Sequence, residues 1–417
     1  MLKSFRISNF RNLVNVEFRP VGSNLLIGPN NAGKTSLCSA LRFLSLTASG
    51  DLEAAAQNAV GETWNIANAY VSDRTLQFDL WATLEDGGQS LDFEYTLQIA
   101  VAKGTGGFGV SLRARKERLV LTGGEFAKTV LLECDNELAQ VLNEEQYLQL
   151  LPPALVSIAG RQLSQEARLQ HGTRHLAKTI SPSDATMLSR LYDLQANRLS
   201  HLFKRYLQSW MYFNLNPHAL RSHRVVSEKP IIYPDGSNLS KVMFTLHNER
   251  QRVEKRIIES LKSIEPKVEL LSFTSPDPQS VYLFLEDPEQ NRFGTQSMSD
   301  GTLRYLVFAY LVYSLSDGKS AMPFAPLVIV EEPEDGLYVG QLKPLFEKID
   351  ASGANGQFVF TSHSPYFIDL WEKNLQGVHL LKPGKPSSVL VQPDPVKLEA
   401  LLNEMPLGEL HFREMLS

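Results

Sequence analysis

The sequence has little of what marks several specialised classes of protein. Its 417 residues include only two cysteines, Cys38 and Cys134, too few for the disulfide framework of a small secreted domain. The formal net charge is −5, so the chain as a whole lacks the positive excess typical of nucleic-acid-binding proteins. It shows no repeat of fixed period and no low-complexity segment. These absences favour an ordinary globular protein in a reducing, cytoplasmic setting.

Long apolar runs are also scarce. The longest, residues 303–315, contains Arg304 and is too short for a bilayer core about 30 Å thick. The first six residues lack the apolar region of a signal peptide. We therefore expect no membrane association. The length is enough for two or three lobes around more than one core.

The most informative segment that is present lies at residues 28–35. Gly-Pro-Asn-Asn-Ala-Gly-Lys-Thr fits the phosphate-binding pattern G-x-x-x-x-G-K-[ST], with an apolar strand predicted before it and a helix after it. Backbone N–H groups would hold phosphate oxygens, Lys34 would reach the β- and γ-phosphates, and the Thr35 hydroxyl would bind Mg²⁺. We predict a nucleoside triphosphate site whose loop residues are Gly28, Asn30, Asn31, Ala32, Gly33, Lys34, Thr35 and Ser36.

The middle of the chain changes from strand patterns to helical patterns. Apolar residues alternate over 76–84, 91–101 and 108–114, which predicts an antiparallel sheet with one buried face. The spacing is helical from about 136 to 210, and residues 238–264 predict two more helices.

We expect a parallel β/α pattern to return after about Val281. The sequence is thus divided into three parts: a first nucleotide-binding part (1–135) with the antiparallel subdomain, a helical lobe (136–270), and a second nucleotide-binding part (271–417).

Two later apolar strands end in residues that suit a magnesium–nucleotide site. Residues 326–330 are followed by Glu331 and Glu332, of which one carboxylate can orient Mg²⁺ and the other can polarise the attacking water. Residues 357–361 are followed by His363, which can sense the γ-phosphate from a strand's carboxyl end. Alone, the acids are equally compatible with a core strand that ends in solvated carboxylates, and a lone histidine is more often structural.

A third segment, residues 298–304, precedes an apolar helix. Ser299 or Asp300 can cap this helix, and Gly301 permits a close backbone approach. The segment is therefore either a capped helix start or a second phosphate-binding helix N-terminus.

Together these motifs resemble the ABC-type ATPase heads of the RecF, OLD and SMC group, over the whole chain. The resemblance is greatest to compact bacterial AAA-type ATPases that carry Leu-Gly-Glu-Leu near the C-terminus, here at 407–410. The matching segments are residues 9–13 (a RecF-like hairpin), 28–35 (Walker A), 298–302 (the degenerate ABC signature), 327–332 (Walker B) and His363 (the switch histidine).

The resemblance implies an α/β fold: an ABC-type P-loop ATPase head with an antiparallel β subdomain and an inserted helical lobe. It implies ATP and Mg²⁺ as cofactors, and a head-to-tail dimer in which Ser299 and Gly301 complete the partner's ATP site. It further implies Glu332 as general base, Lys34 and His363 as other catalytic residues, Thr35 and Glu331 as metal ligands, and Arg11 and Asn12 near the phosphates.

Some positions depart from the family pattern. Glu331 replaces the usual Walker B aspartate, and Asp300 stands where glycine is common in transporters. The Asp300 carboxylate would oppose a γ-phosphate unless it is turned away, towards Arg304. Tyr338 and Val339 stand where some relatives carry His-Pro, and Gln162 is a weak candidate for the Q-loop glutamine.

Three functions are compatible with these features. The first is an ATP-driven switch without a TOPRIM nuclease, a homodimer or larger homo-oligomer that controls an operon-encoded effector, commonly a nuclease, in anti-phage defence. The second is a RecF-like DNA-repair ATPase. The third, a scaffold that binds ATP without hydrolysis, is disfavoured by the acids at 331 and 332. Candidate DNA contacts for the second are Arg161, Arg168, Arg174, Lys178, Arg198, Lys204 and Arg205.

Overall fold

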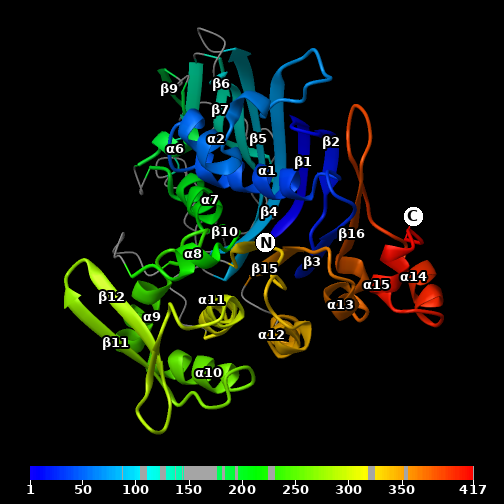
Figure 1. Cartoon of the computed structure of the whole chain (residues 1–417). Helices are drawn as coiled ribbons and strands as arrows, with labels where there is room; N and C mark the ends of the chain where they lie inside the picture. Colours follow the sequence, from blue (N-terminus) through cyan, green and yellow to red (C-terminus); the bar gives the residue numbers. More distant parts are fainter. Residues whose placement is uncertain are drawn as a thin grey trace. The chain divides into compact units, whose positions relative to one another are not determined.

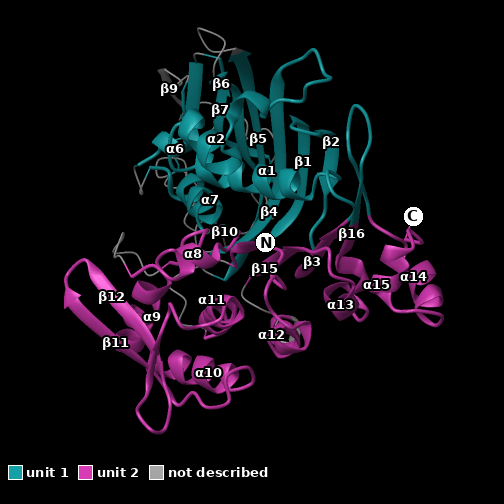
Figure 2. Ribbon diagram, in the orientation of Figure 1, with its two compact units in different colours: residues 1–21, 28–210, 380–391 teal, residues 22–27, 211–379, 392–417 magenta. Residues whose placement is uncertain are grey.

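The computed structural model describes residues 1–86, 88–103, 110–122, 128–136, 138–142, 144, 176–180, 184–192, 196–223, 231–317, 325–351 and 356–416. The chain forms two compact units (Figure 2). The first comprises residues 1–21, 28–210 and 380–391, and the second 22–27, 211–379 and 392–417. The units interleave along the chain, whereas the sequence predicted three consecutive parts, 1–135, 136–270 and 271–417.

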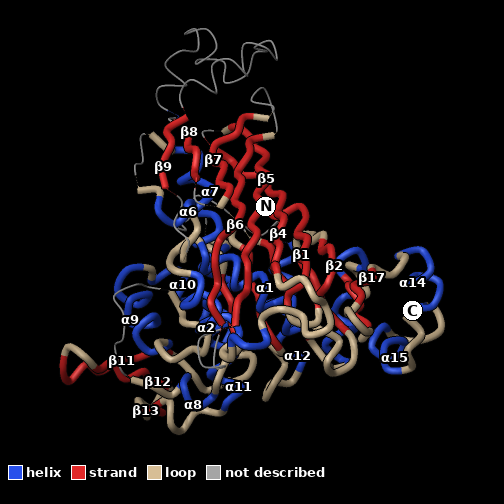
Figure 3. Tube along the Cα trace, turned by 90° about the horizontal axis from the view of Figure 1, so that it is seen from above, coloured by secondary structure: helices blue, strands red, loops and turns tan. Residues whose placement is uncertain are grey.

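The first unit is built on an eight-stranded antiparallel sheet in the order β2-β1-β4-β5-β6-β7-β8-β9 (Figure 3). Along β4 and β5 the buried side chains alternate with less buried ones, so the sheet predicted from the apolar alternation is confirmed. The strands are β1 (Leu2–Phe10), β2 (Leu13–Phe18), β4 (Thr75–Asp86), β5 (Gln89–Lys103), β6 (Val110–Leu121), β7 (Thr129–Asp135), β8 (Leu138–Leu142) and β9 (Leu176–Ile180).

The helical pattern expected from residue 136 is wrong at its start. Strands β8 and β9 lie within that range and extend the sheet. A segment of only five residues, such as Leu138–Leu142, suits either period, and here pairing with β7 decides the conformation of β8, after a turn in which Asn136 has a φ of 54°. Later in the range, α6 (Met187–Arg190) and α7 (Arg198–Gln208) are helical as predicted.

The helices of the first unit lie against its antiparallel sheet (Figure 1), and aromatic side chains join the two layers. Phe43, on the helix that follows the P-loop (residues 28–35), has its ring centroid 6.0 Å from that of Phe10 and 5.6 Å from that of Phe78. On α7, Phe203 packs 5.4 Å from Phe93. These contacts set α1 (Lys34–Thr47) and α7 on the sheet, and α2 (Leu52–Val60) packs beside α1.

The second unit contains the parallel sheet, in the order β10-β14-β15-β3. Its strands are β10 (Met211–Phe213), β14 (Leu327–Glu331), β15 (Gln357–Thr361) and β3 (Ser23–Ile27). Every residue of the last three is buried, as is typical of a parallel sheet covered on both faces. β16 (Val378–Lys382) follows β3 in the sheet order and enters the first unit at Leu380, where β17 (Val389–Val391) pairs with it.

The parallel pattern returns later than predicted. Val281 lies in β12 (Ser280–Glu286), the central strand of a small antiparallel sheet with β11 (Leu270–Asp277) and β13 (Arg292–Gly294). Val281, Leu283 and Leu285 are its buried side chains, and this alternation is that of an antiparallel strand with one buried face. Parallel pairing resumes only at β14.

Two helices predicted over 238–264 are present as α9 (Leu239–Glu249) and α10 (Gln251–Leu261). The remaining helices of the unit are α8 (Pro217–Leu220), α11 (Asp300–Leu315), α12 (Val339–Ala351), α13 (Pro365–Ile368), α14 (Pro395–Leu402) and α15 (Leu407–Phe412). Among the described residues, no helix combines the length and apolarity needed to cross a membrane. The fold is mixed α/β with a large antiparallel sheet.

Candidate functional site

The P-loop has a backbone that requires glycine at two positions. Gly28 and Gly33 have φ angles of 145° and 103°. A Cβ atom on Gly28 would lie 2.1 Å from the Leu381 carbonyl oxygen, and one on Gly33 would lie 3.1 Å from the Asn12 amide. The strand, loop and helix predicted around the motif are confirmed, because β3 ends at Ile27 and α1 begins at Lys34.

The ammonium group of Lys34 lies at this loop. Its side chain is largely buried, and Nζ donates hydrogen bonds to the carbonyl oxygens of Gly28 (2.7 Å) and Pro29 (3.1 Å). Thr35 is exposed at the first turn of α1. The ammonium group and the N-terminus of a 14-residue helix together make this loop suited to phosphate.

The hairpin residue Asn12 is bound to the P-loop. Its Nδ2 atom donates to the carbonyl oxygen of Asn31 at 3.2 Å and to the Ser388 hydroxyl at 3.0 Å. Arg11 adopts a φ of 51°, and its carbonyl accepts a hydrogen bond from Asn68 at 2.7 Å. No sequence pattern singles out Asn68 or Ser388, because both lie far along the chain from the hairpin. The predicted contacts of Arg11 and Asn12 with phosphates stay predictions.

The two adjacent glutamates at the end of β14 have different surroundings. Glu331 is buried, and its Oε1 atom accepts a hydrogen bond from the hydroxyl of Tyr212, on β10, at 2.9 Å. Glu332 has a φ of 46°, its side chain is half-exposed, and its Oε1 atom lies 3.8 Å from Nε2 of His363. Tyr212 was missed by the sequence analysis, since a three-residue strand carries no recognisable pattern.

The parallel register brings the ends of three strands to one edge of the sheet. Glu331 pairs with Thr361, and Thr361 pairs with Leu26, the residue before the last of β3. The Glu332 N–H group donates to the Thr361 carbonyl oxygen at 3.1 Å. The carboxyl edge of the sheet thus carries both acids and the turn with His363, and the P-loop begins at the residue that follows Ile27.

Glu334 ties the two polar strand ends together and was not singled out from the sequence. Its Oε1 atom accepts hydrogen bonds from the Ser362 hydroxyl and from the Ser364 N–H group. Its Oε2 atom is buried without a partner among the described residues. Burial raises the pKa of this carboxyl, although the bond from Ser362 acts in the opposite direction. Glu334 therefore positions the turn that carries His363.

Residues 298–302, the signature segment, form the predicted helix cap. The Ser299 hydroxyl oxygen accepts the Thr302 N–H bond at 3.0 Å, and Thr302 in turn donates to Glu265 at 2.7 Å. The close approach expected at Gly301 is made to the molecule's own backbone: a Cβ atom there would lie 2.4 Å from the Gly336 carbonyl oxygen. The start of α11 is thus packed against the loop that follows the acids of β14.

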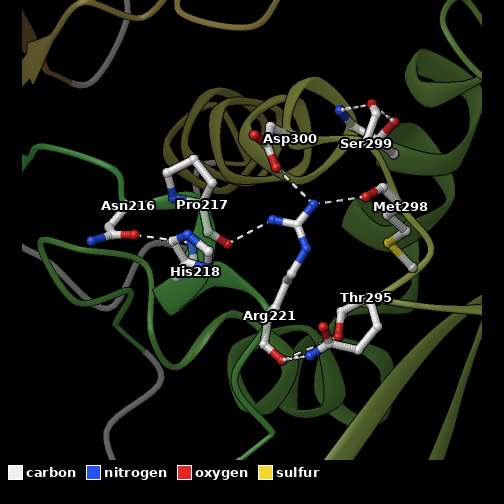
Figure 4. A network of polar contacts seen from close by, with 10 residues as sticks. Asn216, Pro217, His218, Arg221, Thr295, Met298, Ser299 and Asp300 are labelled. Carbon is white, nitrogen blue, oxygen red and sulfur yellow. Dashed lines mark hydrogen bonds and ion pairs between the residues drawn. The ribbon is translucent and has the colours of Figure 1, made fainter.

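The expected pairing of Asp300 with Arg304 is wrong. Asp300 forms an ion pair with Arg221 at 2.7 Å, as Figure 4 shows. Arg304 is buried and faces Asp335, with the closest nitrogen and oxygen 3.9 Å apart. The spacing of four along a helix suggested a local pair, but Arg221, which follows α8, reaches Asp300 from outside the helix.

Several remaining predictions concern cations and the Q-loop. Gln162, Arg161, Arg168 and Arg174 lie outside the described residues, as does the side chain of Lys178. Lys204 is buried and donates to the carbonyl oxygens of Ser189 (2.7 Å) and Leu191 (3.0 Å), while Arg198 pairs with Asp86. The prediction that Lys204 contacts DNA is wrong, because its ammonium group donates hydrogen bonds to these buried carbonyl oxygens instead. Arg205 is exposed.

Comparison with known proteins places the chain in a family. The family described as AAA ATPase domain matches residues 1–368, and the chain belongs to it. A search of curated proteins found no match. Among solved structures the chain is similar to the SMC head domain from Thermotoga maritima (10% identity, TM-score 0.43, 94% of this chain and 99% of that one). It is also similar to an Smc head domain with an extended coiled coil, bound to the C-terminal domain of ScpA, from Pyrococcus furiosus. That structure has 10% identity and a TM-score of 0.47, and the match covers 97% of this chain and 98% of that one.

Proposed function

We propose that the protein hydrolyses ATP and uses the reaction as a conformational switch. The observation that carries this proposal is the single sheet edge at which Glu332, His363 and the start of the P-loop follow three adjacent parallel strands. A nucleotide-binding loop alone would suit many proteins. The additional half-exposed carboxylate beside a histidine supplies a candidate base for attack on a γ-phosphate.

In the proposed reaction Glu332 accepts a proton from a water molecule as its oxygen attacks the γ-phosphorus. A new P–O bond forms, the bond to the β–γ bridging oxygen breaks, and ADP and inorganic phosphate are the products. Lys34 stabilises the negative charge that develops on the phosphate oxygens. His363, 3.8 Å from Glu332, orients that carboxylate and responds to the loss of the γ-phosphate.

The residues fit a magnesium ion by the chemistry of their donors. The Thr35 hydroxyl and the Glu331 carboxylate are hard oxygen ligands of the kind that Mg²⁺ prefers. When bound, Mg²⁺ neutralises phosphate charge. Tyr212 holds the Glu331 carboxylate in place through its 2.9 Å hydrogen bond.

We further propose that two copies associate head to tail around ATP. The 16-residue helix α11 begins at Asp300, directly after Ser299, and its N-terminus suits the γ-phosphate of nucleotide bound by the other copy. Association on ATP binding and release on hydrolysis would be transmitted to a partner effector. By the resemblance to compact bacterial ATPases, we assign this switch to the control of an effector nuclease in anti-phage defence.

The test is the mass of the purified chain with and without Mg²⁺–ATP, in a Glu332→Gln variant that cannot abstract the proton. We expect turnover to fall by about 10²–10⁴-fold and ATP to drive a monomer of 46.7 kDa into a dimer or larger assembly that recruits its operon neighbour. Lys34→Ala is the control that should abolish both ATP turnover and ATP-driven assembly. An ATP-independent monomer with unchanged turnover in Glu332→Gln would refute the proposal.

A further inference from the structure

Arg221 lies at the centre of a polar network around the signature segment (Figure 4). Its guanidinium group donates to the carbonyl oxygens of Pro217 (2.8 Å) and Met298 (2.9 Å), and it forms the 2.7 Å ion pair with Asp300. Its own carbonyl oxygen accepts a hydrogen bond from the Thr295 hydroxyl at 3.2 Å. Arg221 therefore holds the chain on both sides of Ser299 from outside that segment.

The Asp300 carboxylate is the feature that this network counters. Asp300 is the first residue of α11 and stands between Ser299 and Gly301, with half of its side chain exposed. A negative charge at this point repels any phosphate that approaches the start of the helix. Arg221 is only 18% exposed, so its attraction for Asp300 is screened less by solvent than that of a surface cation.

The neighbouring charges do not duplicate this role. Arg304, one turn further along α11, is directed to Asp335, and its Nε atom is buried without a hydrogen-bond partner among the described residues. Glu265 is engaged by the Thr302 hydroxyl. Among the ion pairs of the described residues, Asp300 is joined only to Arg221.

We infer that Arg221 is a positioning residue: by neutralising Asp300, it makes the N-terminus of α11 able to receive the γ-phosphate of ATP bound by a second copy of the chain. This inference rests on the proposed function. Arg221 itself does not touch the phosphate. Its contribution is to remove a repulsive charge, and its bonds to Pro217 and Met298 keep the guanidinium group beside Asp300.

The test compares four full-length proteins, all carrying Glu332→Gln: the parent, Arg221→Met, Asp300→Asn, and the two changes combined. Methionine keeps the length of the side chain without its charge. The measurement is the protein concentration for half-maximal association in Mg²⁺–ATP. We expect Arg221→Met to raise it at least about tenfold, Asp300→Asn to associate at least as readily as the parent, and the double variant to recover most of the loss.

Recovery in the double variant separates charge neutralisation from a merely structural role, because the lost bonds to Pro217 and Met298 are not restored by Asp300→Asn. Arg292→Met is the matched control, since Arg292 pairs with Glu286 on the small sheet of the same unit. Binding of a fluorescent ATP analogue at low protein concentration should be equal in all variants.

Two results would overturn the inference while leaving the proposed function intact. In the first, Arg221→Met associates as readily as the parent; in the second, the double variant associates as weakly as Arg221→Met. A parent protein that fails to associate with ATP would overturn both.

Discussion

At the scale of the residue, Glu331 and Glu332 illustrate how neighbours in sequence acquire different chemistry. A strand directs successive side chains to opposite sides. Glu331 ends β14 in a buried position against Tyr212, whereas Glu332 leaves the strand with a positive φ and faces His363. These surroundings favour Glu331 as the metal-orienting carboxylate and Glu332 as the base.

Tyr212→Phe tests the supporting role of the tyrosine hydroxyl. The change removes the 2.9 Å hydrogen bond that orients Glu331. We expect the Mg²⁺ concentration for half-maximal ATP turnover to rise about tenfold, as is typical when a partner of a metal ligand is lost. Tyr282→Phe, on the small antiparallel sheet, is the control. Equal magnesium dependence in wild type and Tyr212→Phe would contradict the assignment of Glu331.

At the scale of the element, Gly301 and Glu117 each join segments that are separate in the chain. Gly301 lets the first turn of α11 meet the loop after β14 at Gly336. Glu117, on β6, accepts hydrogen bonds from the Tyr95 hydroxyl and from the N–H groups of Met187 and Leu188 at the start of α6. Both joints are invisible in local sequence patterns, because each depends on a partner distant in the chain.

Gly301→Ala should separate the signature helix from that loop. The added methyl group would lie 2.4 Å from the Gly336 carbonyl oxygen, which belongs to backbone and cannot rotate away. We expect a loss of about 1–3 kcal/mol in the free energy of unfolding, together with weaker ATP-driven association. Gly22→Ala is the control, because nothing lies within 4 Å of a Cβ atom there. Unchanged urea unfolding in Gly301→Ala would show that the two segments do not pack as described.

Glu117 predicts a dependence of stability on pH. Burial raises the pKa of its carboxyl from the usual 4.5 to about 7, against the opposing effect of its three hydrogen bonds. The folded protein therefore binds this proton more tightly than the unfolded chain. The stability that the protonated Glu117 carboxyl contributes is fully present below about pH 4.5 and is lost as the pH rises through about 7.

The measurement is the free energy of unfolding of wild type and Glu117→Gln in urea from pH 4 to pH 8. The difference between the two should fall by at most about 3 kcal/mol over this range, because each pKa unit corresponds to 1.36 kcal/mol. Glu133→Gln, at an exposed pair with Arg118, should leave the pH profile unchanged. A constant difference between wild type and Glu117→Gln would exclude a raised pKa in the folded state.

At the scale of the whole molecule, charge argues against DNA as the primary ligand. The net charge is −5, and two of the cations proposed from sequence as DNA contacts are engaged within the protein. We expect weak binding of duplex DNA, with an affinity that changes little between 50 and 200 mM salt. Fluorescence anisotropy with a labelled duplex measures this. A steep salt dependence, lost on reversing the charge of Arg205, would instead support the RecF-like alternative.

The sequence by itself determined the features that depend on contiguous residues. These features are the P-loop between a strand and a helix, the apolar strands followed by the acids and by His363, and a helix cap at Ser299 or Asp300, of which the structure shows Ser299. The same reasoning found the long antiparallel strands β4 and β5, because an alternation over nine residues (76–84) or eleven (91–101) has one interpretation.

The tertiary structure alone decided which distant residues meet. Strand β8 exists because β7 pairs with it, Tyr212 binds Glu331 because β10 joins the sheet beside β14, and Asp300 is neutralised by Arg221 rather than by Arg304. A short segment or a single charge can be satisfied in several ways by its neighbours in sequence. The choice among them is made by burial, which favours the partner that leaves the fewest polar groups without a hydrogen bond.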